Sequence, residues 1–459
     1  MNPMLIATAA VLVSTGTAQA SSVLPVRTAQ LAASPPAPAP AAAPAPETRD
    51  LDSFAGRYLG ADGCPLTVTR SARRLYLDNG CTGEWRGLTR RSPVDWDAGA
   101  TVISEGPPAL RVRFAAPVAG RSPSVTVSGA GAKADATANR REAVVRTEVT
   151  FKSADGVSLA GTVTAPLGAG RKPAIVLVHG SGEQDRHGYA SIIDVLAAHF
   201  LEQGFVVLQY DKRGSGASGG DWRTASFKTL AEDALAGRRL LLAQPDVDPA
   251  RVGVGGSSQA GWISAMAVKA DPAVPFVFLI GAGGAALTVE AQDDYNVSVG
   301  MRCAGVAPAD IERVMVQRGA FFDALRRPAA AARLRTLTEP LAREPKLADW
   351  VMPAEIDRSA GQWFVALETG FDPLPVWRVY RGRALFAFGG LDDQTPGPRA
   401  SQLVRGLRKP RFEVLYSERS QHLGLLADDP CKVGLEHVSR FDKALWADID
   451  RGIAKLAAR

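Results

Sequence analysis

Two patterns of hydrophobic and polar positions divide the chain near residue 140. Before that point, short runs alternate between apolar and polar residues and are separated by turn residues. These runs are LTVTR (66–70), RLYLD (74–78), LRVRF (110–114) and SVTVSG (124–129). Such alternation, with a turn such as Asp78-Asn79-Gly80 between runs, is typical of antiparallel strands. We therefore expect residues 48–140 to form a small antiparallel β domain.

After about residue 147, continuous apolar runs alternate with helical spacing. A hairpin is expected around Ala154-Asp155-Gly156, and helices near 192–202 and 224–244. Runs typical of strands buried on both faces lie at 173–180, 205–211, 251–256, 275–281, 383–390 and 411–416. Strands that alternate with helices predict an α/β domain over 147–459 with a mostly parallel, helix-covered sheet.

One long interval interrupts this alternation. Residues from about 285 to 380 are rich in Ala, Leu and Arg, and apolar residues recur with helical spacing at Ile311, Val314, Phe321 and Leu325. We expect a helical cap above the sheet. The final stretch places Leu435, Val438, Phe441, Leu445, Ile449 and Ile453 on one face, which predicts an amphipathic C-terminal helix.

The N-terminal segment has the features of a secretory signal. An apolar stretch from Met4 to Val13 precedes an Ala18-Gln19-Ala20 cleavage pattern, so residues 1–20 are interpreted as a signal peptide. Residues 21–47 are rich in Ala and Pro and are expected to be a linker. We therefore expect a periplasmic or secreted protein, and no segment is apolar enough to remain inserted in a membrane.

The four cysteines fit an oxidising compartment. Cys64 and Cys81 flank a predicted hairpin, and Cys303 and Cys431 lie in the later domain, so these two pairs are the favoured disulfides among three connectivities. Their spacings do not match a zinc site, and the chemistry inferred below needs neither metal nor cofactor.

The formal net charge of +6 is spread along the chain, which does not favour a nucleic-acid partner. The oligomeric state stays open.

A candidate nucleophile lies where a predicted strand runs into a predicted helix. The segment Gly256-Ser257-Ser258-Gln259-Ala260-Gly261 resembles the G-x-S-x-G nucleophile elbow, in which a serine occupies a strained turn. Residues two before and two after the serine must be small, and Gly256 and Ala260 meet that need around Ser258. Ser257 is the rival, but Gln259 two residues later is bulky.

Three further segments supply an oxyanion donor, the acid and the base. In VLVHGSGEQDR (176–186), the N–H of Ser181 is one expected oxyanion donor, and the N–H of Gln259 is the other. FGGLDDQTPG (388–397) carries the expected acid, Asp392, with Asp393 as its rival. His422 is the expected base, because it alone of five histidines lies in a loop after the last strand. The other four are His179, interpreted as structural, His187, which precedes the serine, and His199 and His437, on predicted helices.

Residues from about 147 to the end resemble bacterial secreted α/β-hydrolase esterases with a helical cap, of the dienelactone-hydrolase and prolyl-oligopeptidase-like branch. The strings HGSGEQDR (179–186), YDKRGSGAS (210–218) and GGSSQAGW (255–262) carry the resemblance. It implies hydrolysis of a small-molecule carboxylic ester through an acyl-enzyme. In the second string, Asp211 and Arg213 are expected to brace a loop under the site.

Two alternatives stay open at the level of sequence. A serine peptidase or an acyl thioesterase would use the same acyl-enzyme chemistry on the same scaffold, with the cap deciding the substrate. A catalytically inactive secreted binding protein is the alternative of a different class. The order Ser258, Asp392, His422 argues against it, because that is the chain order of a working triad in this fold.

Overall fold

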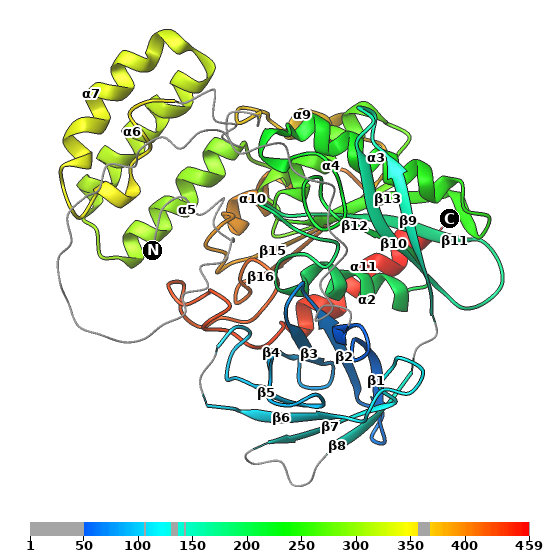
Figure 1. Ribbon diagram of the computed structural model, residues 1–459. Coiled ribbons are helices and arrows are strands. Elements are labelled where there is room, and N and C mark those ends of the chain that lie inside the picture. Colours follow the sequence, from blue (N-terminus) through cyan, green and yellow to red (C-terminus); the bar gives the residue numbers. More distant parts are fainter. Residues whose placement is uncertain (1–49, 105–106, 130–135, 142–143, 357–367, 459) are drawn as a thin grey trace.

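A closed β-barrel forms the first part of the chain in the computed structural model, which describes residues 50–104, 107–129, 136–141, 144–356 and 368–458 (Figure 1). The expected signal peptide and linker lie outside these residues. The barrel strands are β1 (Gly56–Gly60), β2 (Pro65–Arg70), β3 (Leu75–Asn79), β4 (Glu84–Arg90), β5 (Asp95–Ala98), β6 (Leu110–Phe114), β7 (Ser124–Gly129) and β8 (Ala136–Arg140).

Each barrel strand pairs antiparallel with the next, and β1 closes the barrel on β8. The four alternating runs of the sequence form β2, β3, β6 and β7. Side chains fill the interior: the ring of Phe54 lies 4.9 Å from that of Phe114 and 6.0 Å from that of Trp96, measured between centroids. Eight strands leave room for little else, because a barrel of this size is just wide enough for its own side chains.

A second, mostly parallel sheet forms the centre of the remaining chain. Its strands are β9 (Val144–Lys152), β10 (Ser158–Pro166), β11 (Lys172–Val178), β12 (Val206–Tyr210), β13 (Val247–Ser257), β14 (Phe276–Ile280), β15 (Arg383–Gly389) and β16 (Phe412–Ser417). They lie in the order β16-β15-β14-β13-β11-β12-β10-β9. β10 runs antiparallel to both of its neighbours, β9 and β12, and β9 and β10 form the expected hairpin. The α/β class predicted from the apolar runs is confirmed.

Helices cover both faces of this sheet, because successive strand residues point to opposite faces. One face packs on α3 (Phe227–Leu242), α4 (Ala260–Ala270) and α10 (Gly397–Gly406), and the other on α2 (Ile192–Glu202) and α11 (Lys443–Ala457). In β11, Val176 belongs to the first core, and Ile175 and Leu177 belong to the second. A parallel strand buried on both faces has apolar residues at nearly every position, and for this reason the strands could be predicted from continuous apolar runs in the sequence.

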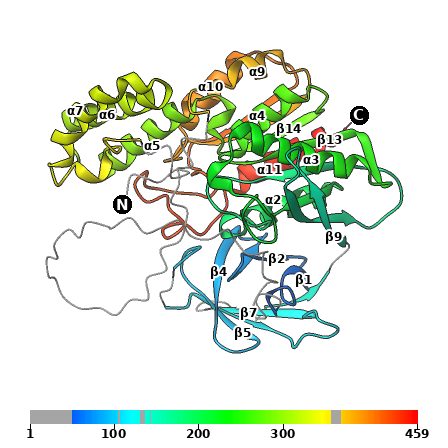
Figure 2. The same cartoon turned by 45° about the horizontal axis from the view of Figure 1, so that its top comes forward.

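The interval between β14 and β15 is helical in its described parts. It contains α5 (Val289–Cys303), α6 (Pro308–Arg326), α7 (Ala331–Ala342) and α9 (Leu374–Val379). Helices α5, α6 and α7 lie together beside the sheet (Figures 1 and 2). They have small apolar clusters of their own, one around Met301 and Val314 and one around Phe321 and Leu334. Short 3-10 helices lie at Tyr189–Ser191, Trp222–Thr224, Gly283–Ala285, Pro328–Ala330 and Ala348–Trp350.

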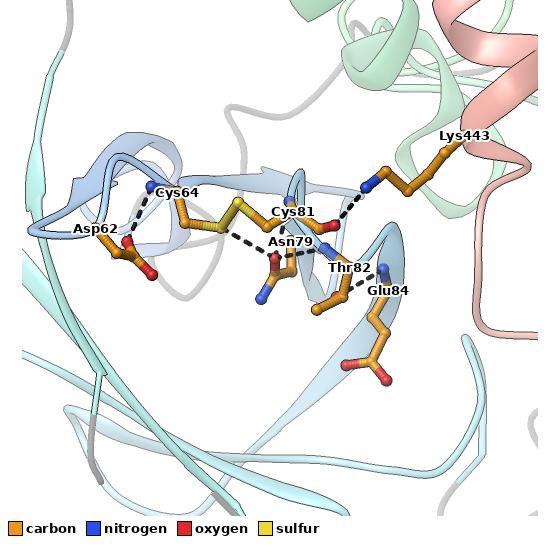
Figure 3. The surroundings of a disulfide bond; sticks show 7 residues. All are labelled: Asp62, Cys64, Asn79, Cys81, Thr82, Glu84 and Lys443. Atoms are coloured by element: carbon orange, nitrogen blue, oxygen red, sulfur yellow. Dashed lines mark hydrogen bonds between the residues drawn. A yellow bond between two sulfur atoms is a disulfide. The ribbon is translucent and has the colours of Figure 1, made fainter. Parts of the chain in front are cut away.

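Both favoured disulfides are present, Cys64–Cys81 in the barrel and Cys303–Cys431 between α5 and the segment after β16. Beside the first one, Lys443 at the start of α11 donates a 2.6 Å hydrogen bond from Nζ to the carbonyl oxygen of Cys81 (Figure 3). The barrel is therefore tied to the C-terminal helix next to its own cross-link.

The barrel also packs on the α/β part through aromatic and hydroxyl contacts. Trp85 stacks on Phe441, with 5.1 Å between ring centroids. The hydroxyl groups of Thr69 and Ser191 lie 2.7 Å apart at the start of α2. These contacts involve β2 and β4 of the barrel, which Figure 1 shows next to α2 and α11.

The C-terminal helix is shorter than predicted. It begins at Lys443, whereas the apolar positions Leu435, Val438 and Phe441 belong to an irregular segment before it. The carboxylate of Asp442 caps the helix by accepting from two backbone N–H groups of its first turn. The preceding segment bonds to the barrel instead: the N–H of Trp85 donates to the carbonyl of Ser439 over 2.7 Å. Hydrogen bonds to the barrel therefore hold this segment in an irregular conformation, although its apolar residues have the spacing of a helix.

Candidate active site

The candidate nucleophile lies in a strained turn between β13 and α4. Ser258 has a φ of 58°, in the left-handed region that non-glycine residues rarely adopt. Its N–H donates to the carbonyl of Ile280 at the end of β14 over 3.1 Å. Gly256 has no room for a side chain, since a Cβ there would lie 2.0 Å from the carbonyl oxygen of Val178 and 3.0 Å from the Cβ of Ala260. The crowding explains why the elbow requires small residues at these two positions.

The rival serine occupies a different position. Ser257 is the last residue of β13 and is 2% exposed, with its backbone paired to β14. Ser258 is half-buried and is the only one of the two with a positive φ. The strained elbow geometry therefore belongs to Ser258.

The acid and base candidates meet beyond the ends of β15 and β16. Nδ1 of His422 lies 2.9 Å and 3.0 Å from the two carboxylate oxygens of Asp392. The Oδ1 atom of Asp392 also accepts hydrogen bonds from the N–H groups of Gln394 and Thr395, each over 2.8 Å. The carboxylate that holds the histidine is thus fixed from its other side by the turn. Asp393, the rival acid, makes no hydrogen bond with His422.

The environment of His422 prepares it to accept a proton. Burial lowers the pKa of His422, but the charge of Asp392 and the hydrogen bond to it outweigh burial and raise the pKa above the usual 6.5. The other ring nitrogen, Nε2, is buried and has no hydrogen-bond partner among the described residues. Burial and the neighbouring charge of Asp392 raise the pKa of Asp393 to about 6.

The end of β14 brings the serine and the histidine to one place. Ile280 binds the N–H of Ser258, and Gly281 follows with a φ of 56°. A Cβ on Gly281 would lie 2.1 Å from the carbonyl oxygen of His422 and 3.1 Å from its Nδ1. The Thr395 hydroxyl, beside Asp392, donates to the carbonyl of Gly281 over 3.0 Å. Gly281 therefore lies against His422 and binds the loop that carries Asp392, and the residue before it binds Ser258.

The expected oxyanion segment lies against the elbow. A Cβ on Gly180 would be 3.6 Å from the Cβ of Ser258. Within the described part of the chain, no acceptor binds the N–H of Ser181 or the N–H of Gln259. Unpaired N–H groups beside a strained serine are what a developing oxyanion requires.

A buried lysine that the sequence analysis did not single out connects these two segments. Nζ of Lys212 donates to the carbonyl oxygens of Gly180 (2.9 Å) and Gly182 (3.0 Å) and to Oε1 of Gln259 (2.8 Å). Burial lowers the pKa of Lys212 to about 7, against the attraction of the Asp233 charge. The available signal was a lysine directly after a buried strand, since lysine is seldom fully buried.

The neighbours of Lys212 in sequence brace the loop, each with its own partner. Asp211 accepts from Nε and Nη2 of Arg186, over 3.1 Å and 2.9 Å. Arg213 donates to both oxygens of Asp233 over 2.6 Å and 2.7 Å, and to Asp155 over 2.8 Å. Neither Asp211 nor Arg213 pairs with the other.

His179 is buried on the sheet and packs edge-on against Tyr210, with 4.8 Å between ring centroids. Burial, with the nearby charge of Lys212, lowers the pKa of His179 to about 3, so the ring is neutral at ordinary pH. The remaining histidines each lie beside a carboxylate: His187–Asp194 at 2.9 Å, His199–Asp450 at 2.6 Å and His437–Glu436 at 3.6 Å. His437 precedes α11 and is not on a helix, contrary to expectation.

Helix α5 contacts the loop that carries the acid. The hydroxyl of Tyr295 donates to the carbonyl of Asp392 over 2.9 Å, and the amide of Asn296 donates to the carbonyl of Asp393 over 3.0 Å. No sequence signal pointed to these two contacts, which depend on how α5 crosses the end of the sheet.

The described residues contain no cluster of three or more His, Cys, Asp or Glu side chains arranged to hold a metal ion. Across the same residues, no helix has the length and apolar character needed to cross a membrane.

Comparison with known proteins gives relatives for part of the chain. Over 142 residues it is 33% identical to an uncharacterised protein of Mycobacterium tuberculosis, covering 30% of this chain and 48% of that protein. Over 92 residues it is 36% identical to esterase EstD of Thermotoga maritima, covering 19% of this chain and 22% of the esterase. The chain thus spans about half the length, or less, of these curated relatives.

Solved structures of esterases share low identity with the chain. A Pyrococcus furiosus esterase has a TM-score of 0.44 and 14% identity, covering 68% of this chain and 92% of the esterase. Acetyl xylan esterase 1 of Thermoanaerobacterium has a TM-score of 0.40 and 15% identity, covering 70% and 86%.

The model of the X-Pro dipeptidyl-peptidase family, S15, matches residues 155–424. This span runs from the β9–β10 hairpin to the loop that carries His422 and includes Ser258 and Asp392. It amounts to more than half of the 459 residues. The chain therefore belongs to the S15 family of X-Pro dipeptidyl-peptidases, a family of hydrolases.

Proposed function

We propose that this protein is a serine hydrolase that cleaves carboxylic esters, with Ser258 as nucleophile, His422 as general base and Asp392 as the residue that orients the histidine. The observation that carries the proposal is the buried Asp392–His422 pair, in which Nε2 has no partner among the described residues. The pair lies against Gly281, the residue after the one that binds the N–H of the strained Ser258. The order of the three residues along the chain supports the same assignment.

The chemistry follows from these positions. As Oγ of Ser258 attacks the acyl carbon, its proton passes to Nε2 of His422, and the hydrogen bond to Asp392 stabilises the imidazolium that forms. The imidazolium then gives the proton to the departing alkoxide. Water, deprotonated by the same nitrogen, attacks the acyl-enzyme and releases the acid and the free serine.

The negative oxygen of the tetrahedral intermediate needs donors that are ready before the reaction. The unpaired N–H groups of Ser181 and Gln259 beside Ser258 support this role. Loss of one such donor lowers kcat about 10²- to 10³-fold in a serine hydrolase.

A serine peptidase is the second candidate, because the family that includes this chain is named for dipeptidyl-peptidases. A serine peptidase would carry out acyl transfer with the same kind of nucleophile, so the proposed catalytic residues do not separate the two activities. An acyl thioesterase would also use them. We favour the ester because an esterase is among the partial relatives, and a small-molecule ester needs no separate site for a peptide amine.

We further propose that the protein works outside the cytoplasm, in the periplasm or as a secreted protein of a bacterium. The two disulfides support this location, because such bonds persist in oxidising compartments. The barrel is proposed to be a packing module for the α/β part, since its interior is filled by its own side chains.

The test is the hydrolysis of p-nitrophenyl butyrate by the purified chain and by Ser258→Ala, with Ser257→Ala as the matched control. We expect Ser258→Ala to lose at least about 10⁴-fold in kcat and Ser257→Ala to retain activity. Activity that survives in Ser258→Ala would reject the assignment.

If the wild type fails on the ester but cleaves an X-Pro p-nitroanilide, the peptidase is favoured. If it fails on both and resists a fluorophosphonate, the protein is an inactive binding protein.

A further inference from the structure

Lys212 is a buried lysine whose hydrogen-bonding capacity, in the ammonium form, is fully used. It is 2% exposed, and its three N–H donors match three acceptors: the carbonyls of Gly180 and Gly182 and the side-chain oxygen of Gln259. Two acceptors belong to the loop after β11, and the third belongs to the elbow after β13. One cation therefore connects two segments that are about eighty residues apart in the chain.

Each of these segments carries one expected oxyanion donor. The carbonyl of Gly180 and the N–H of Ser181 belong to the same planar peptide unit and point in opposite directions. A hydrogen bond that fixes the carbonyl therefore also fixes the direction of the N–H. It also polarises the amide, which makes the N–H a stronger donor. On the other segment, Lys212 holds the side chain of Gln259, whose own N–H is the second donor.

We propose that Lys212 is a positioning residue that sets the direction and strength of the two N–H donors of the oxyanion hole. The inference rests on the serine hydrolase proposed above. Lys212 is not a catalytic residue in this scheme, because it acts through the peptide of Gly180 and Ser181 and through Gln259.

The cost of this arrangement argues for an electrostatic role and not for a simple brace. Burying an ammonium group is unfavourable unless a partner compensates it. No carboxylate binds Lys212 directly in the described residues. The charged and aromatic groups around it are the carboxylate of Asp233 on α3, the neutral ring of His179 and the ring of Trp222, whose centroid is 6.0 Å away. A neutral side chain would hold two loops together at lower cost.

The experiment compares Lys212→Met, which keeps the chain length but removes the charge and the donors, with Lys212→Arg. The matched control is Lys172→Met. Nζ of Lys172 also binds two glycine carbonyls, those of Gly168 (2.8 Å) and Gly170 (3.3 Å), but at the opposite end of β11 and exposed. For each variant, kcat and KM are measured with p-nitrophenyl butyrate. The inhibition constant of an alkyl trifluoromethyl ketone, which forms a tetrahedral adduct with the serine, is measured alongside.

We expect Lys212→Met to lower kcat about 10- to 100-fold, a loss up to that of one oxyanion donor, with KM changed less than about threefold. Inhibition by the ketone should weaken by the same factor as kcat, Lys212→Arg should recover most of the loss, and Lys172→Met should match the wild type. A kcat for Lys212→Met within about threefold of wild type, or a loss confined to KM, would overturn the proposal.

Failure of this proposal is distinguishable from failure of the proposed function. If Ser258→Ala keeps its activity, the serine mechanism is wrong whatever Lys212 does. If Ser258→Ala is inactive and Lys212→Met is fully active, only the positioning role is wrong. Should Lys212→Met fail to fold, Gln259→Leu removes one of the three acceptors and keeps the backbone N–H. There we expect about a tenfold loss of kcat at unchanged KM, and an unchanged kcat would overturn the proposal.

Discussion

Replacing Asp392 with asparagine tests how the turn after β15 controls the proton on His422. In the wild type, Oδ1 of Asp392 is held by the N–H groups of Gln394 and Thr395, and Oδ2 lies 2.9 Å from Nδ1 of the histidine. The asparagine must keep its carbonyl oxygen toward the two N–H donors. Its NH₂ group then replaces Oδ2 and donates to Nδ1 of the imidazole.

The consequence is a histidine in the wrong tautomer. With Nδ1 as acceptor, the proton of the neutral ring must sit on Nε2, which then cannot take the proton of Ser258. A substitution of this kind in a serine triad lowers kcat about 10⁴-fold, equivalent to about 5.4 kcal/mol at 1.36 kcal/mol per factor of ten. Little change in stability is expected, because the asparagine preserves the shape and the bonds to the turn.

The assay is the kcat for p-nitrophenyl butyrate, with urea unfolding as the check on stability. Asp393→Asn is the matched control, because it changes the adjacent carboxylate, which makes no hydrogen bond with His422. We expect this control to stay within about threefold of wild type, since Asp393 makes no hydrogen bond with His422 and asparagine preserves the shape of its side chain. If Asp392→Asn keeps more than about a tenth of the wild-type kcat, or if both variants lose equally, the reasoning is refuted.

Two further predictions follow from the charges in the α/β part. His422, as the proposed base, would accept a proton only when neutral, and its pKa is raised. We therefore expect kcat/KM to increase with pH through a midpoint above 6.5, which a pH profile will test, and a midpoint below 6.5 would contradict this. Asp233→Ala leaves the buried Arg213 with the exposed Asp155 as its carboxylate partner and a long hydrogen bond to Ser153, so we expect the free energy of unfolding in urea to fall by about 3 kcal/mol. A loss below about 1 kcal/mol would mean that Arg213 finds another partner.

Much of the α/β part could be predicted because its strands are buried on both faces. The run at 173–178 has no polar residue after Pro173, and such a run has few alternatives to a central strand. The barrel was only partly readable. Strands such as β4, with the sequence EWRGLTR, do not alternate, because Trp85 faces the α/β part and not the barrel interior. Contacts with another part of the chain decide that pattern.

In the candidate site, too, contacts with distant parts of the chain decide what the sequence alone could not predict. Asp392 and Asp393 are adjacent in sequence and equal in chemistry, and only the turn that binds Oδ1 of Asp392 distinguishes them. Lys212 stood in a recognised string, but its role depends on two carbonyls and an amide from distant segments. The predicted start of α11 was too early in the chain. The spacing of apolar residues cannot reveal that the carbonyl of Ser439 accepts a hydrogen bond from the N–H of Trp85 in the barrel, and so is not part of a helix.

Helix α5 is attached to both loops that carry the acid and the base. Tyr295 and Asn296 bind the backbone of the acid loop, and the disulfide from Cys303 reaches Cys431, nine residues beyond the histidine. An exchange of the helical insertion between relatives that begins before Val289 would remove these attachments together with α6 and α7. One that begins after Cys303 would leave them intact. Chimaeras made at the second boundary would therefore report on the role of α6 and α7 alone, whereas those made at the first would mix that role with the alignment of the proposed triad.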